Sequence, residues 1–310
     1  MSVSAWHVGL PAAFAPGDRV VAFSAAELER ARAAGVPALG FHEAVAAPPE
    51  PGCAVEVHLP PYRGHAFVPV LAWLAARLAA GVAPVSWYAT RQQGPDSIRA
   101  LLEGAGWTLE RDRSRGMVRL RGAPPAEPER PDPRRFTALL GGRRVELAAD
   151  YGVFSPDRVD AGTALLLEVA LGRPPVDRVA DVGVGYGALA IGLVLGEAAG
   201  AALATDVDCV ALWLAGENAA LCGVPLDLSC TPDPAAIGAT ALTVCNVPTH
   251  IDRGATARFM AALAGRARGG RLLAVVHASL EARYTRHLEA GGLRVRRHPG
   301  PAHVVLEAAG

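Results

Sequence analysis

The chain has 310 residues, enough for one large domain or for two domains of average size. Hydrophobic residues make up 51% of it and charged residues 19%, so it can bury a sizeable core and is not disordered throughout. Thirty basic residues balance thirty acidic ones, which argues against a protein that coats nucleic acid or an anionic membrane through its net charge.

The cysteines and the N-terminus indicate a cytoplasmic protein. The five cysteines include no C-x-x-C pair, which argues against a zinc site or a disulfide framework. The first residues lack the basic stretch of a secretory signal. The longest apolar stretch, residues 188–205, is interrupted by Glu197 and by glycines, so it favours a helix and a strand over a membrane span. We expect no membrane and no metal among its partners.

A proline-rich segment predicts the division of the chain into two halves. Five prolines fall between Arg121 and Pro133, and such a run fits neither a helix nor a central strand. We therefore expect a linker at residues 123–135, between an N-terminal domain at 1–122 and a C-terminal domain at 136–310.

The two halves resemble each other, which predicts an internal duplication. With a shift of 186 residues and no gap, the segment 102–107 lies over 288–293, and Val118 lies over Val304. Further matches fall in the same order and at the ends of expected elements. The first half contains no Gly-x-Gly-x-Gly loop, whereas the second half does.

Apolar runs alternate with amphipathic stretches in both halves, which predicts an α/β fold with parallel sheets. In the second half we expect strands at 176–182, 201–205, 241–245 and 271–277. We expect helices at 186–195, 207–221, 255–268 and 280–290. Two hairpins are expected, at 136–149 around two adjacent glycines and at 293–306 near the end of the chain.

The segment Asp181-Val182-Gly183-Val184-Gly185-Tyr186-Gly187 joins an expected strand to an expected helix. Glycines at 183, 185 and 187 allow a sharp turn and let a ligand approach backbone amides closely. Asp206 ends the next strand, where a carboxylate can accept hydrogen bonds from both hydroxyls of a ribose. The pattern predicts a nucleoside cofactor and leaves a dinucleotide open.

A third motif, Cys245-Asn246-Val247-Pro248-Thr249-His250, follows another expected strand. It resembles the Asn-Pro-Pro-aromatic motif that enzymes methylating amino groups carry at this position. An amine conjugated to a ring is a poor nucleophile, so such a site must orient it and accept hydrogen bonds from it. The Asn246 side-chain oxygen and the Val247 carbonyl, fixed by Pro248, are the predicted acceptors. This motif, with an acid at Asp181, favours S-adenosylmethionine as the cofactor.

Most of the chain resembles the RsmC-type guanine-N2 methyltransferases of ribosomal RNA. Residues 151–167, with Gly-Val-Phe-Ser at 152–155, are similar to the family's segment before the cofactor strand. Residues 181–187 and 218–221 are similar to its cofactor loop and to the Asn segment after its second strand. The resemblance implies two Rossmann-like methyltransferase domains related by duplication, of which the N-terminal one is degenerate.

The resemblance also implies the roles of particular residues. Cofactor binding is expected of six residues: Asp181, Gly183, Gly185, Gly187, Asp206 and Asn246. Catalysis is expected of Asn246, Val247 and Pro248, and substrate binding of Phe154, Ser155, Thr249 and His250. The implied partner is ribosomal RNA or a ribosomal subunit.

Two departures from the family motif leave another substrate open. Val247 replaces the first proline, and Thr249 replaces the aromatic residue expected to stack on a flipped base. Stacking of a base on an aromatic ring contributes about 1–3 kcal/mol, so its loss matters for a nucleobase substrate. A small-molecule amine is therefore the alternative substrate. A non-catalytic binding module and a nicotinamide-dependent oxidoreductase are the remaining alternatives.

Overall fold

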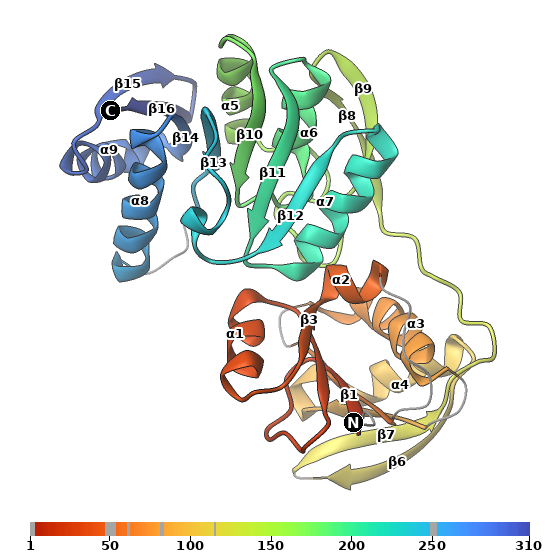
Figure 1. The fold of residues 1–310 in the computed structure, drawn as a ribbon. Helices are drawn as coiled ribbons and strands as arrows, with labels where there is room; N and C mark the ends of the chain where they lie inside the picture. The colour runs from red at the N-terminus through yellow and green to blue at the C-terminus, as the bar shows by residue number, and fades with distance from the viewer. Residues whose placement is uncertain (1–3, 47–53, 61–62, 81–83, 115, 249–252) are drawn as a thin grey trace. The chain divides into compact units, whose positions relative to one another are not determined.

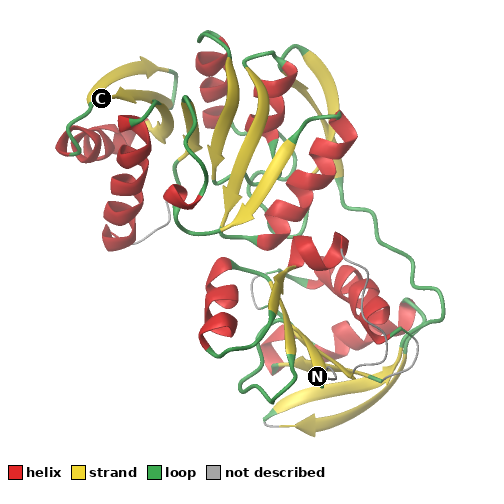
Figure 2. Cartoon of the chain, in the orientation of Figure 1, coloured by secondary structure: helices red, strands yellow, loops and turns green. Residues whose placement is uncertain are grey.

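The computed structural model describes residues 4–46, 54–60, 63–80, 84–114, 116–248 and 253–310 (Figure 1). The chain divides into two compact units, Met1–Pro133 and Arg134–Gly310. Strands alternate with helices in both units (Figure 2). In the described part of the chain, no helix combines the length and the apolar character needed to cross a membrane.

The N-terminal unit is built on a seven-stranded sheet in the order β3-β2-β1-β4-β5-β7-β6. Its strands are β1 (Ala5–Val8), β2 (Arg19–Ala22), β3 (Ala38–Gly40), β4 (Ala54–His58), β5 (Val85–Ala89), β6 (Thr108–Ser114) and β7 (Met117–Ala123). Its helices are α1 (Ala25–Ala33), α2 (Phe41–Ala46), α3 (Val68–Ala79) and α4 (Pro95–Gly104). Strands β1 to β5 pair in parallel, and β7 runs antiparallel to both β5 and β6.

The C-terminal unit has a second seven-stranded sheet in the order β12-β11-β10-β13-β14-β16-β15. Its strands are β10 (Val176–Val182), β11 (Ala199–Asp206), β12 (Leu226–Cys230), β13 (Leu242–Asn246), β14 (Arg271–His277), β15 (Arg294–Pro299) and β16 (His303–Ala309). Its helices are α5 (Ala161–Leu171), α6 (Ala188–Leu195), α7 (Cys209–Cys222), α8 (Arg253–Arg268) and α9 (Glu281–Ala290). Strands β8 (Arg135–Leu140) and β9 (Arg143–Ala148) form a separate hairpin.

The two sheets have the same strand order, and this confirms the predicted pair of Rossmann-like α/β domains. The likeness extends to spacing. Strand β14, helix α9 and strands β15 and β16 each begin 186 positions after their counterparts β5, α4, β6 and β7. The shift found in the sequence therefore aligns whole elements, in agreement with an internal duplication.

The central strands of the C-terminal sheet are buried on both faces. In β14, the five consecutive residues from Leu272 to Val276 are all buried. A parallel sheet covered on both faces shows such unbroken apolar runs, because side chains of both faces point into a core. Ligands then bind at the carboxyl edge of the strands, where the loops after β10, β11 and β13 meet.

Local details differ from the expectations. Helix α6 begins at Ala188 and not at Tyr186, because Gly187 at its N-cap still has a φ of +94°. Strand β12 and helix α5 were not expected. Strand β7 ends at Ala123 and β8 begins at Arg135, and no helix or strand lies between these two residues.

Candidate active site

A cavity of about 780 Å³ lies at the carboxyl edge of the C-terminal sheet. Its volume suits a small-molecule or cofactor site, which is usually between about 300 and 1,000 Å³. Eight of the predicted site residues line it: Phe154, Asp181, Gly183, Gly185, Asp206, Asn246, Val247 and Pro248. Ser155 and Gly187 are not among the lining residues. Thr249 and His250 lie outside the described residues.

The glycine loop is tied to the neighbouring strand and leaves open space above itself. The amides of Gly183 and Val184 donate to the Thr205 carbonyl at 2.8 and 2.9 Å. Gly183 has a φ of +79°, and a Cβ added to it would meet no atom within 4 Å. The left-handed conformation therefore favours glycine here, and the backbone is accessible to a ligand in the cavity.

Gly187 has a different role in the same loop. A Cβ added to it would lie 3.2 Å from Ile191 Cδ1 and 3.4 Å from Ala215. Gly187 therefore lets α6 begin close to α7. Its predicted part in cofactor binding is indirect in this arrangement, through the position of the loop.

Asp206 links the end of β11 to the glycine loop. Its Oδ2 accepts a hydrogen bond from the Gly185 amide at 2.9 Å, and its Oδ1 accepts one from the Asp208 amide at 3.0 Å. Each carboxylate oxygen has further acceptor capacity, so both can still take a hydroxyl. Burial raises the pKa of Asp206 to about 6, and the negative charge of Asp208 acts in the same direction.

Asp181 is the second carboxyl group at the cavity and is only 1% exposed. Its Oδ2 accepts a hydrogen bond from the Ala190 amide, in α6, at 3.0 Å. Burial raises the pKa of Asp181 to about 7, and the charge of Asp206 adds to the effect. One buried and one partly buried carboxyl group that line the same cavity make it favourable for a cationic ligand.

Asn246 is the last residue of β13, and its side chain has a defined orientation. Its Nδ2 donates to Asp160 Oδ2 at 3.1 Å and to Thr163 Oγ1 at 2.9 Å. A carboxylate can only accept, so the amide nitrogen must face Asp160 and the Oδ1 remains as the acceptor that the side chain offers. The Val247 amide donates to the Val275 carbonyl at 3.0 Å, which fixes the backbone after Asn246.

Asp160 and Thr163 were not predicted as site residues. Asp160 is the N-cap of α5, and its side chain also accepts from the amides of Gly162 and Thr163. An Asp directly before an apolar helical stretch is a known N-cap signal, so this signal could have located Asp160 at a helix start. Its contact with Asn246 could not be read from local sequence.

The segment before α5 places an aromatic ring at the cavity. Phe154 lines the cavity and is 69% exposed. Ser155 has a φ of +52°, and its hydroxyl donates to the Arg158 carbonyl at 2.7 Å. The Tyr186 hydroxyl donates to the same carbonyl at 3.2 Å, which links this segment to the glycine loop. Ser155 therefore shapes the segment, while Phe154 presents its ring.

Comparison with known proteins identifies the class of this site. The family model described as "Methyltransferase small domain" matches residues 144–293. These residues include the glycine loop and the Asn246 segment. The C-terminal unit is therefore a methyltransferase domain of the S-adenosylmethionine-dependent class, which confirms the class and the cofactor predicted from the sequence.

The whole chain has an RsmC-like fold. It is similar to the structure of the T. thermophilus 16S rRNA N2 G1207 methyltransferase (RsmC) in complex with AdoMet and guanosine. That similarity has a TM-score of 0.72 at 23% identity and covers 100% of this chain and 88% of that one. The two-domain architecture is therefore shared over the full length.

A curated relative is similar over a shorter stretch. The ribosomal protein L11 methyltransferase of Geobacter sulfurreducens is 43% identical over 112 residues. This stretch is 35% of the present chain and 33% of that protein, so the chain spans about a third of the length of this relative.

Proposed function

We propose that the protein transfers a methyl group from S-adenosylmethionine to the exocyclic amine of a guanine in ribosomal RNA. The observation that carries the proposal is the orientation of Asn246. Its Nδ2 is held by Asp160 and Thr163, and its Oδ1 is left to accept a hydrogen bond at the cavity. Such an acceptor can orient an amine hydrogen and so direct the nitrogen lone pair toward a methyl donor.

The cavity residues fit the cofactor. Asp206 retains acceptor capacity for ribose hydroxyls, and Gly183 leaves its backbone open to a ligand. The raised pKa values of Asp181 and Asp206 reflect buried carboxyl groups that a cation would stabilise in their charged form. S-Adenosylmethionine, when bound, supplies an electrophilic methyl group on a cationic sulfur. The chain's own residues then need only bind the cofactor and the amine, orient them toward each other and exclude water.

Phe154 supports a nucleobase as the methyl acceptor. The family motif places its aromatic residue where this chain has Thr249, whereas Phe154 presents a largely exposed ring at the same cavity. Bases of any sequence stack on aromatic rings with about 1–3 kcal/mol. We therefore propose that Phe154 stacks on the flipped guanine. A ribosomal substrate also agrees with the cytoplasmic location expected from the sequence.

The test is a methylation assay with methyl-labelled S-adenosylmethionine and unmodified ribosomal subunits or naked ribosomal RNA. Digestion of the RNA and identification of the labelled nucleoside should give N2-methylguanosine. The Asn246→Ala protein should bind the cofactor and label the RNA about 100-fold more slowly. If the wild-type protein binds the cofactor but labels no RNA, the proposed substrate is wrong.

The second candidate substrate is a small-molecule amine. Thr249 and the net charge of zero favour it. Threonine offers no ring for a nucleobase to stack on, and a neutral chain has no overall attraction for the phosphates of RNA. In that case the same methyl-donor cavity would act on a free amine. Transfer of label to amine-containing metabolite fractions, and not to RNA, would support this candidate.

A further inference from the structure

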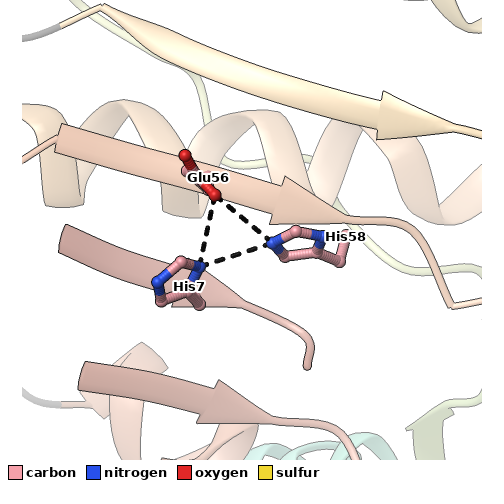
Figure 3. Close-up of side chains that lie close together, drawn as sticks. All are labelled: His7, Glu56 and His58. Atoms are coloured by element: carbon pink, nitrogen blue, oxygen red, sulfur yellow. Dashed lines mark hydrogen bonds and ion pairs between the residues drawn. The ribbon is translucent and has the colours of Figure 1, made fainter. Parts of the chain in front are cut away.

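Two histidines and a glutamate meet on the sheet of the N-terminal unit (Figure 3). His7 of β1 lies directly opposite Glu56 of β4, and His58 follows Glu56 by two residues. Side chains two residues apart in a strand share one face of the sheet. All three side chains therefore point toward one another, as Figure 3 shows.

The separations of the three potential ligand atoms suit a metal ion. His7 Nδ1 lies 3.4 Å from His58 Nε2 and 3.5 Å from Glu56 Oε2, and these last two atoms lie 3.7 Å apart. Zinc binds nitrogen and oxygen at roughly 2.0–2.2 Å in a tetrahedron, which places neighbouring ligand atoms about 3.4 Å apart. The three atoms therefore form one face of a tetrahedron of the required size.

Outer partners hold each of the three side chains in place. Asp18, which is itself buried, lies 3.0 Å from His7 Nε2, the ring nitrogen that faces away from Glu56 and His58. The Tyr88 hydroxyl donates to Glu56 Oε1 at 3.3 Å, and its ring stacks on His58 with centroids 5.0 Å apart. Carboxylate partners of this kind accompany most metal-binding histidines.

The cluster lies in the N-terminal sheet at the positions that carry site residues in the C-terminal sheet. His58 is the last residue of β4, and Asn246 is the last residue of β13. Two positions before each of them, Glu56 pairs with His7 of β1, and Val244 pairs with Asp181 of β10. By this register, His7 corresponds to Asp181, and His58 corresponds to Asn246. The N-terminal unit has no glycine loop, yet chemistry-bearing side chains stand at the same edge of its sheet.

We propose that His7, Glu56 and His58 bind one divalent ion of the zinc class, with its fourth coordination position open. Two neutral imidazoles and one carboxylate form a donor set that zinc uses in sites with an open position. The Glu56 side chain is 33% exposed and that of His58 is 17% exposed, so the cluster is reachable from solvent. The proposal does not depend on the substrate of the C-terminal unit.

The test is calorimetric titration of the full-length protein, without a histidine tag and freed of metal, with zinc chloride. The wild-type protein should bind one zinc ion that Glu56→Gln and His58→Gln proteins bind about 100-fold more weakly or not at all. Asp18→Asn should weaken binding by about 10- to 100-fold, as expected for an outer partner. Cobalt bound to the wild-type protein should show the visible absorption of a tetrahedral complex.

The control is His65→Gln, because His65 is an exposed histidine of the same unit outside the cluster. It should leave zinc affinity unchanged within about twofold. If the His58 variant fails to fold, as judged by circular dichroism, the Glu56 variant decides, since Glu56 is the most exposed of the three side chains. The proposal is overturned if wild-type protein binds no zinc at micromolar concentrations, or if the folded variants bind it equally well.

Discussion

The side chain of Asn218 pairs with the backbone of Ala148 as one strand pairs with another. Asn218 Oδ1 accepts from the Ala148 amide at 2.7 Å, and its Nδ2 donates to the Ala148 carbonyl at 2.9 Å. The same Nδ2 donates to the Tyr186 carbonyl at 2.8 Å. Asn218 is fully buried in α7, so one amide joins this helix, the β8–β9 hairpin and the glycine loop.

Replacing Asn218 with Ala should destabilise the protein by about 2–4 kcal/mol, because it leaves buried backbone groups without their partners. Urea unfolding, followed through the transition of the C-terminal unit, would measure this loss in the free energy of unfolding. Leu221→Ala, on the same helix at a residue that is 60% exposed, is the control and should change stability by no more than about 0.5 kcal/mol. Equal losses in the two variants would contradict the structural role of Asn218.

Asn246→Ala should lower turnover by about 100-fold while cofactor affinity stays nearly unchanged, since the acceptor acts on the amine. Thr163→Val removes an oxygen that holds the Asn246 amide and should lower turnover by a smaller factor, about tenfold. Single-turnover assays together with calorimetry of cofactor binding separate the two effects. Unchanged turnover in the Asn246 variant would mean that the proposed site is wrong.

Gly183→Ala should weaken S-adenosylmethionine binding by at least about tenfold, because the new methyl group projects into the cavity. The strain of an alanine in the left-handed region costs about 1–2 kcal/mol of stability. Gly142→Ala is a matched control: Gly142 also has a φ of +79° and open space around it, but lies in the β8–β9 turn. Both variants should lose stability, and only the first should lose cofactor affinity in calorimetry.

The free protein should lose stability as the pH rises through the range of the two buried carboxyl groups. The pKa values of Asp206 and Asp181 are raised to about 6 and about 7 by burial, above those of the unfolded chain. Their favourable contribution is complete below about pH 4 and is lost as the pH passes these folded-state values.

The Asp181→Asn protein lacks this titrating group. Its free energy of unfolding, measured relative to that of the wild type, should therefore be higher at pH 8 than at pH 5 by on the order of 1–2 kcal/mol. Denaturant unfolding at both pH values, without cofactor, measures the difference. Asp177→Asn, an exposed position on the same strand, makes the same change in charge and serves as the control. A constant difference between Asp181→Asn and the wild type would refute the assigned burial effect.

Phe154→Ala should raise the KM for RNA by about 5- to 100-fold through loss of base stacking, with little change in cofactor affinity. Phe154→Trp keeps a stacking surface and should retain most of the activity. Leu139→Ala, at another exposed apolar residue that is outside the cavity lining, should have no effect on KM. If the alanine and tryptophan variants at 154 behave alike, stacking is not the role of Phe154.

Regular apolar patterns made much of the fold predictable. The expected bounds of β10 and β14 agree with the structure, because a run of buried residues marks each strand: 179–182 in β10 and 272–276 in β14. Helix α5 was missed because it is apolar on nearly all sides and shows little helical period. Strand β12 was missed because this edge strand carries polar residues such as Asp227 and Ser229.

The site was predictable only where one local motif defines it. The glycine loop and Asp206 could be placed at the same sheet edge because the loop follows β10 and Asp206 ends β11, and both line the cavity. The hydrogen bond between Asp160 and Asn246 joins residues 86 positions apart, so no local pattern indicates it. The cluster of His7, Glu56 and His58 likewise depends on the register of two strands that are not adjacent in sequence.

The constant spacing of the last four elements shows where the two copies have diverged in length. The segments 85–123 and 271–309 are equally long, so a chimera could exchange them without an insertion or deletion. Upstream of β5 and β14 the spacing differs, and this is the part of each copy that carries the glycine loop or its counterpart. The two copies therefore differ in length in the part of each sheet that precedes β5 or β14, whereas the segment from β5 or β14 to the last strand has the same length in both.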